Sequence, residues 1–521
     1  MKHLKLSAVA LAASLLAGCA VGPDYQRPTL PETKAYSPEP MAEATASSSQ
    51  SKGGEAQRII PGRDIQADWW TLFQSPALNA LIEEAFKANP DLEAAQAALR
   101  AAQENVAAQQ GFFFPTVQMN YSPARTKIAG NLGGNSPGVQ GNGSVISTFQ
   151  GKPASEGGTA PFNKPVIYNF HTAQLSVGYD PDLFGSNRRQ VESLQAQAQV
   201  QRFEWEAARI TLATNIVAAA IQDALLRQQI ATSQAMVEAS GAAVEITRKQ
   251  LAAGYVTRLD VAAQEQALAQ AQQLLPPLRR QLEQNRNLLR VLAGSPPDRE
   301  LPSFALDELK LPQELPLSLP SQLVEQRPDV RAAEEQLRSA FADVGVARAA
   351  RLPQFSITAN TGGAASNFSQ MFWPSGRFFS LALGITQPLF DGGTLKHRER
   401  AAQEQLNRAA ALYRSAVLSA WQNVADGLQS IHSSAEVLQT ADNASQAAQA
   451  TLDLTRRQHA KGYLDRLALI SAEQAYRAAT LNQLQARAAR LGDTAMLFQA
   501  LGGGWWQRPD AEVAVATPAK N

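Results

Sequence analysis

The side chains that most often carry out chemistry are few in this chain and lack catalytic spacing. The five histidines are scattered over 521 residues without the short spacings of metal ligands: His3, His171, His397, His432 and His459. No HExxH, GxSxG, GxGxxG or Walker A pattern occurs. A single cysteine excludes a disulfide framework and a thiolate metal cluster. We therefore expect no catalytic residues, no metal and no cofactor.

The single cysteine lies where a lipid-attachment site would be. Lys2 and Lys5 precede a short apolar run, and Leu16-Ala17-Gly18-Cys19 follows, as in a secretory signal peptide covering residues 1–18. L-A-G-C resembles the bacterial lipobox, in which the cysteine becomes the first residue and its thiol receives diacylglycerol. An ordinary signal peptide with a chance cysteine is the alternative. We expect a covalent lipid on Cys19, and several acyl chains there would anchor the protein in a membrane.

Composition narrows the class of protein. Lys and Arg number 47 and Asp and Glu 46, which gives a net charge of +1. There is thus no basic surplus for binding nucleic acid. Mean hydropathy is -0.23, and we see no long apolar segment after the N-terminus. A polytopic helical membrane protein would need several apolar stretches of about 20 residues and is excluded.

The sequence contains two copies of one unit. N-P-D-L-E-A-A-Q-A-A-L-R from Asn89 matches R-P-D-V-R-A-A-E-E-Q-L-R from Arg327, an offset of 238 (327 − 89). T-R-K-Q-L-A-A-G-Y-V-T-R-L from Thr247 matches T-R-R-Q-H-A-K-G-Y-L-D-R-L from Thr455, an offset of 208 (455 − 247). The offsets differ because the first copy carries a Gly/Asn/Ser/Pro-rich insert at about 130–165. We expect this insert to be an extracellular loop.

Each copy predicts a helix, a pair of strands, a very long helix, a turn and a returning helix. The predicted strands alternate apolar and polar residues over Val117–Ser122, Leu175–Tyr179, Phe355–Asn360 and Leu381–Ile385. This alternation suits a barrel wall between lipid and water. It equally suits half-buried strands of a soluble sheet, so the strand pattern alone leaves both possibilities open.

The long helices favour the membrane interpretation. From about 187 to 252, and again from about 395 to 461, the chain contains no proline. Each segment has roughly 65 residues, which form a helix about 100 Å long. No compact domain houses such helices, so they must project as hairpins that turn at Gly254-Tyr255 and Gly462-Tyr463. Pro276-Pro277 is expected to kink the first returning helix.

Four strands cannot close a barrel in a membrane, where about eight is the smallest number. An open sheet edge in lipid would leave backbone groups without hydrogen-bond partners, at several kcal/mol each. If the strands are membrane strands, several copies must share one barrel. Three copies would supply twelve strands and six helical hairpins.

Several motifs together resemble the TolC-like outer-membrane efflux proteins, in particular the lipoprotein branch of OprM and the NodT-type factors. They are V-G-P-D-Y from Val21, D-W-W-T-L-F from Asp68, Y-D-P-D-L-F-G from Tyr179, Q-P-L-F-D-G from Gln387 and the two Gly-Tyr turns. The resemblance covers residues from Cys19 to about Trp506.

The resemblance implies a mixed α/β membrane protein with four transmembrane strands and long coiled-coil helical hairpins per protomer. A homotrimer would form a twelve-stranded β-barrel, an α-helical barrel and an equatorial belt. The expected order along the chain is a signal peptide at 1–18, a lipidated N-terminal extension at 19–66, a first repeat at 67–294, a Pro-rich equatorial linker at 295–320, a second repeat at 321–502 and a C-terminal tail at 503–521.

The implied function is passive. The protein would be the outer-membrane exit duct of a tripartite efflux system, conducting small molecules such as drugs from an RND-type inner-membrane pump and a periplasmic adaptor. It would be anchored by lipid, span the outer membrane and extend a large part into the periplasm. The alternatives are a periplasm-spanning structural lipoprotein, or a duct for protein secretion or metal efflux.

By resemblance, the helix turns are the sites that contact the adaptor: Arg248, Gly254, Tyr255, Arg456, Gly462 and Tyr463. Glycine there could equally serve only the tight turn. Asp260 aligns with an acidic gate position, where three copies would form a carboxylate ring. It could instead be a solvated acid at a helix N-terminus. In the second copy the gate would depend on Leu467 or on contacts of Asp465 with Arg466.

Overall fold

The computed structural model describes residues 20–29, 33, 35–39, 41–49, 51–128, 135–139, 145–149 and 166–509. The expected signal peptide and Cys19 lie outside these residues. Two compact units emerge, and each is described by itself. The first consists of residues 1–27, 101–198 and 336–410, and the second of residues 28–100, 199–335 and 411–521.

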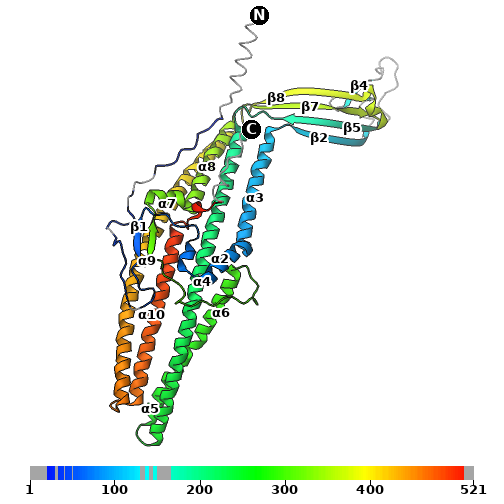
Figure 1. Ribbon diagram of the computed structural model, residues 1–521. Coiled ribbons are helices and arrows are strands. Elements are labelled where there is room, and N and C mark those ends of the chain that lie inside the picture. The colour runs from blue at the N-terminus through cyan, green and yellow to red at the C-terminus, as the bar shows by residue number, and fades with distance from the viewer. Residues whose placement is uncertain are drawn as a thin grey trace, which may run out of the picture. The chain divides into compact units, whose positions relative to one another are not determined.

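A four-stranded antiparallel sheet forms the centre of the first unit (Figure 1). Its strands, in spatial order, are β2 (Thr116–Ile128), β5 (Val166–Tyr179), β7 (Gln354–Ala365) and β8 (Arg377–Thr386). All four strands expected from the alternating pattern are confirmed. Within the described chain β2 and β8 are edge strands.

Large apolar side chains of the sheet face solvent. Met119 is 80% exposed and Phe379 85%, and Leu381, Leu383 and Ile385 are also exposed. A soluble sheet would cover such a row with a helix or a second sheet. The exposed row therefore fits strands that face lipid.

The insert of the first copy follows β2. Its described parts are two short antiparallel strands, β3 (Asn135–Val139) and β4 (Val145–Phe149). The rest of the predicted insert lies outside the described residues. The corresponding connection in the second copy contains the 3-10 turns η5 (Ser369–Phe372) and η6 (Pro374–Gly376).

Two helices of 67 residues each are confirmed, α4 (Ser186–Ala252) and α9 (Thr394–Ala460). At 1.5 Å per residue each is about 100 Å long. One apolar window of α4 has a mean hydropathy of 1.2, so the expectation that no long apolar segment follows the N-terminus was wrong. Since 72% of that window is buried within the protein, its apolar residues serve helix packing.

The first residues of both long helices are capped by an aspartate from the preceding loop. Asp182 accepts hydrogen bonds from the backbone N–H groups of Asn187 and Arg188 at 3.0 and 2.8 Å. Asp391 accepts from Gly393 and Leu395 at 2.8 and 2.7 Å. Carboxylates satisfy the free N–H groups of a helix start in this way. The backbone hydrogen bonds hold the pKa of Asp391 below its usual value.

The returning helices differ between the copies as predicted. In the first copy the helix is divided into α5 (Arg258–Gln273) and α6 (Leu275–Leu292), and Pro276-Pro277 lies just inside α6. Proline cannot donate the backbone hydrogen bond that would continue the helix. In the second copy α10 (Arg466–Ala500) is continuous.

The second unit also contains shorter elements. The helices are α2 (Pro76–Ala88), α3 (Pro90–Gln110), α7 (Pro320–Gln326) and α8 (Pro328–Ala349), with α3 and α8 continuing into the first unit. Strand β1 (Arg58–Pro61) pairs in parallel with β6 (Glu314–Leu317) of the Pro-rich segment. Trp69, in η1 (Trp69–Phe73), is fully buried against Phe498. Trp505, in η7 (Trp505–Gln507), donates its indole N–H to the Gln326 carbonyl at 2.6 Å.

The duplication is visible in equivalent contacts of the second unit. The side chain of Asn89 donates to the carbonyl of Leu292, and that of Arg327 donates to the carbonyl of Ala500. The donors are 238 positions apart and the acceptors 208, the two offsets of the sequence repeat. Each donor satisfies a free carbonyl at the end of the returning helix. The two copies therefore share the same internal geometry.

Candidate functional site

The turns between the long and the returning helices have the same backbone conformation in both copies. Gly254 and Gly462 have φ of 78° and 77°. The N–H groups of Tyr255 and Tyr463 donate to the carbonyls five residues earlier, at 2.9 and 3.0 Å. These are Schellman caps, in which glycine takes the left-handed conformation. Gly254 and Gly462 thus have a structural role whether or not the turns bind a partner.

The residues after these glycines are strongly exposed. Tyr255 is 83% exposed and Tyr463 77%. Beside each turn an arginine joins the two helices of the hairpin. Arg248 donates to Glu265 at 2.7 Å, and Arg456 forms an ion pair with Glu473 at 3.6 Å. The hydrogen bond to Glu265 raises the pKa of Arg248, which is charged at any physiological pH. The sequence-predicted tip residues therefore form two similar exposed groups.

Asp260 takes part in a capping box at the start of α5. Its carboxylate accepts hydrogen bonds from the backbone N–H and the hydroxyl of Thr257, both at 2.7 Å, and the Thr257 hydroxyl accepts from the Asp260 N–H. These bonds hold the pKa of Asp260 below its usual value, with the Thr257 hydroxyl as the largest cause. The carboxylate is therefore ionised at neutral pH.

The corresponding residues of the second copy are arranged differently. Asp465 is the N-cap of α10 and accepts from the backbone N–H of Ala468 at 2.8 Å. Arg466 is the first residue of that helix and is exposed, while Leu467 is half-buried. A carboxylate stands at N3 in the first copy, at Asp260, and at the N-cap in the second, at Asp465. The charged group thus changes position along the helix between the two copies.

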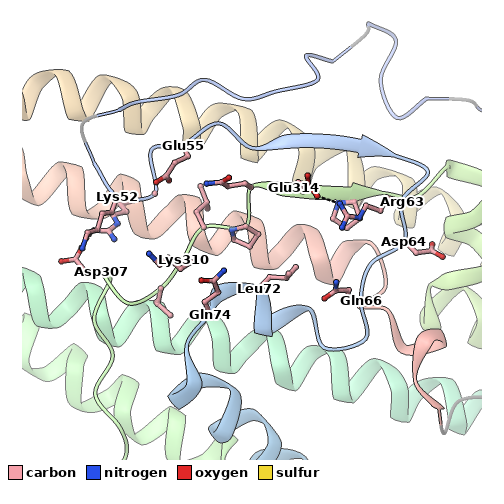
Figure 2. A pocket seen from close by; sticks show the side chains of 17 residues that line it. Lys52, Glu55, Arg63, Asp64, Gln66, Leu72, Gln74, Asp307, Lys310 and Glu314 are labelled. Carbon is pink, nitrogen blue, oxygen red and sulfur yellow. Dashed lines mark hydrogen bonds and ion pairs between the residues drawn. The ribbon is translucent and has the colours of Figure 1, made fainter.

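A polar cavity of about 510 Å³ lies in the second unit, next to β1 and β6 (Figure 2). Ion pairs border it: Arg63 binds Glu314, and Arg487 binds Asp307 at 2.6 Å. The hydrogen bond from Arg487 lowers the pKa of Asp307. Lys52 and Glu55 also line the cavity. Its lining mixes both signs of charge without a nucleophile beside a base, an arrangement typical of a polar joint between segments.

Arg490 is the most deeply buried charged group next to this cavity, at 1% exposure. Its guanidinium donates to the carbonyls of Gly53 and Glu55 at 3.1 and 2.7 Å, to the Thr45 hydroxyl at 3.0 Å and to the Gln57 side chain at 3.4 Å. Burial lowers the pKa of this guanidinium. Arg490 thereby fastens the N-terminal extension to α10.

Sequence reasoning missed two of these arrangements. The capping box had a readable signal, because Thr257-Arg-Leu-Asp260 fits the pattern of Ser or Thr followed three residues later by an acid. The Arg490 cluster had none, because its partners are more than 430 residues away along the chain. Among the described residues no group of three His, Cys, Asp or Glu side chains could hold a metal ion.

Comparisons with known proteins agree with the geometry. The sequence profile described as outer membrane efflux protein matches residues 81–295 and 319–503. The efflux pump outer membrane protein TtgC of Pseudomonas putida is 28% identical over 532 residues, covering 98% of this chain and 99% of that protein. The pyoverdine export outer membrane protein OpmQ of the same species is 27% identical over 439 residues, or 84% and 88% of the two chains.

Solved structures show the same fold. The outer-membrane channel OprN matches with a TM-score of 0.76 and 27% identity, over 94% of this chain and all of that one. The CmeC outer membrane channel of Campylobacter jejuni matches with a TM-score of 0.79 at 18% identity, over 95% and 98%. These relatives are transport channels rather than enzymes. The chain therefore belongs to the outer membrane efflux protein family, and it is an outer-membrane channel that serves efflux.

Proposed function

We propose that three copies of this chain form the exit duct of a tripartite efflux system. The duct conducts small molecules passively, and a pump in the inner membrane supplies the energy. The observation that carries this proposal is the four-stranded sheet with two free edges and an exposed apolar row. Free edges cannot persist in lipid, so the sheet needs further copies to close a barrel.

The burial of equivalent helices supports an assembly of several copies. In α8, Leu337 and Val344 are fully buried. Their equivalents in α3, Leu99 and Val106, remain partly exposed, and Leu92 is the one buried residue of α3. Equivalent helices of a ring need equivalent neighbours, so α3 is expected to pack against another copy. Twelve strands and six hairpins in a trimer would satisfy both the sheet and the helices.

Conductance and mass test this assembly. Purified protein in detergent should have the mass of three chains by native mass spectrometry and should form ion-conducting channels in planar bilayers. A monomer without conductance would contradict the proposal and would favour a structural spacer.

We place the contact with a periplasmic adaptor at the two helix tips. Exposed aromatic rings are frequent anchors of protein interfaces, and the support for this placement is the exposure of Tyr255 and Tyr463. The double substitution Tyr255→Ala and Tyr463→Ala should reduce co-purification of the adaptor at least about tenfold. The Phe variants at both positions, which retain the rings, are the matched control. Equal recovery with the Ala and Phe variants would contradict the placement.

Asp260 is proposed to contribute an acidic ring at the periplasmic entrance. Its exposure and its ionisation at neutral pH support this role. Asp260→Ala removes the capping box and the charge, whereas Thr257→Ala removes the capping box alone. We expect Asp260→Ala to raise single-channel conductance in planar bilayers and Thr257→Ala to leave it unchanged. If both variants change conductance equally, the effect comes from the helix cap.

The second copy would contribute to the same entrance through Asp465, Arg466 and the apolar Leu467. Lipid on Cys19 would add the membrane anchor, and mass spectrometry of the mature N-terminus would detect it. An RND-type pump and small-molecule cargo are the partners that we propose. Identification of the co-purified adaptor and pump would test this against metal export or protein secretion.

A further inference from the structure

The sheet is built from two hairpins that are equivalent residue by residue. In the first hairpin Thr116 of β2 lies opposite Gly178 of β5. In the second, Gln354 of β7 lies opposite Thr386 of β8. Positions 116 and 354 differ by 238, and positions 178 and 386 differ by 208. The strand register therefore reproduces both offsets that the sequence repeat gives for the helical segments.

One junction between hairpins is present within the chain. Strands β5 and β7 pair antiparallel, with Gln174 opposite Gly362. The junction that would follow, from β8 to a further β2, is not formed within the described chain. In a closed barrel built from equivalent hairpins, successive junctions have equivalent registers, because the stagger between strands is fixed by the closure.

We infer that β8 of one copy pairs antiparallel with β2 of the next, with Ala382 opposite Ala124. The offsets determine this pair, since Ala382 follows Gln174 by 208 positions and Ala124 precedes Gly362 by 238. The full ladder runs from Thr386 opposite Asn120 to Phe378 opposite Ile128. This inference rests on the proposed assembly and adds the register of the interface between copies.

The side chains agree with this register. It places Ile385 opposite Tyr121, and both are exposed large apolar residues in the single chain. It also places Phe379 opposite Lys127, where the ammonium group can lie against the ring. A shift by one residue would set the apolar row of β8 beside the polar row of β2. A shift by two would keep the faces matched, so experiment has to separate those registers.

Helix contacts give the same order of neighbours independently of the strands. Within the chain α8 packs against α4, and the hydroxyls of Ser339 and Ser193 are 3.0 Å apart. The equivalent positions are Ala101 of α3 and Ala401 of α9, both exposed in the single chain. By the same symmetry, Ala101 of one copy is expected to touch Ala401 of the neighbour whose β8 it receives.

Disulfide cross-linking in outer membranes tests the two levels separately. Ala101→Cys with Ala401→Cys reports that copies are neighbours in this order. Ala124→Cys with Ala382→Cys reports the register, since opposite residues have Cβ atoms about 4.5–5.5 Å apart. Ala124→Cys with Ser380→Cys, or with Gly384→Cys, reports the registers shifted by two, at about 7–8 Å. Each single-cysteine variant controls for reaction with Cys19.

We expect most of the Ala101/Ala401 and Ala124/Ala382 double variants to migrate as covalent oligomers after mild oxidation. The shifted pairs should give at most about a tenth as much. Cross-linking of the helix pair together with a shifted strand pair would overturn the register and retain the assembly. If neither the helix pair nor any strand pair cross-links, and native mass spectrometry shows monomers, the proposed assembly itself fails.

Discussion

At the residue scale, long-range contacts of single side chains hold the N-terminal extension in place. Arg490 reaches four acceptors between residues 45 and 57, two of them backbone carbonyls. The hydroxyl of Tyr36 donates to the carbonyl of Ser318 at 2.8 Å, and burial raises the pKa of Tyr36. Burying a charge is costly unless it is fully hydrogen-bonded, and the acceptors around Arg490 meet that condition.

Arg490→Ala should release the extension. Truncation leaves buried carbonyls and a buried hydroxyl without donors, and the expected loss is about 3 kcal/mol of unfolding free energy. Limited proteolysis followed by mass spectrometry should then show cleavage between residues 45 and 57. Arg487→Ala, at a less buried ion pair of the same helix, is the control and should leave those residues largely protected. Unchanged protection in Arg490→Ala would contradict the assigned role.

At the element scale, the helix ends explain why the duplicated unit keeps its shape. Gly294 and Gly502 follow equivalent returning helices and have φ of 64° and 91°. A Cβ atom at Gly294 would come within 2.1 Å of the Ala88 carbonyl oxygen, and one at Gly502 within 3.1 Å of the Gln326 oxygen. Positive φ disfavours any L side chain by about 1–2 kcal/mol. Both helix ends therefore require glycine, but to different degrees.

Alanine at the two positions should separate conformational strain from collision. Gly502→Ala is expected to cost about 1–2 kcal/mol, mainly for the positive φ. Gly294→Ala should cost clearly more, because the backbone of residue 88 would also have to move. Thermal unfolding of both variants in the same detergent checks the order. A larger loss of stability for Gly502→Ala would mean that the chain around residue 88 yields easily.

At the scale of the whole molecule, carboxylates bound to arginines connect segments distant in sequence. Glu84 binds Arg299, and this hydrogen bond lowers the pKa of Glu84. Glu399 binds Arg351 and Arg348, whose hydrogen bonds lower its pKa. A carboxylate whose pKa is lowered by folding stabilises the fold above its unfolded value and loses that contribution as the pH falls through its folded value.

The protein should therefore lose stability on acidification below about pH 4.5, the region where unfolded Glu and Asp titrate. We expect the Tm at pH 3.5 to lie on the order of 5 °C below that at pH 7. Glu84→Gln should show a smaller difference, because it removes one of the titrating pairs. An equal Tm at both pH values would show that these pairs contribute nothing measurable.

Asp493 provides the opposite sign. Burial raises its pKa, partly opposed by a hydrogen bond from Ser434, so its ionised form is disfavoured in the folded state at neutral pH. Its cost disappears as the pH falls and the group becomes protonated. Asp493→Asn accordingly should increase the loss of Tm on acidification, whereas Glu84→Gln decreases it.

The local elements could be predicted because their causes are local. The alternation around Met119, the proline-free stretch that became α4 and the break at Pro276-Pro277 each follow from the side chains present at those positions. The duplication was equally readable, since equivalent residues keep constant offsets. From these features the sequence alone determined the element order, the repeated unit and the positions of the two tips.

Only the tertiary structure decided how distant segments meet. The cluster around Arg490, the pairing of β1 with β6 and the contact of Asn89 with Leu292 depend on chain closure over hundreds of residues. No local pattern encodes the partner of a buried polar group, because any complementary donor or acceptor could supply it. The same reason applies to the register of β5 on β7, which the tertiary structure fixes and from which the interface between copies follows.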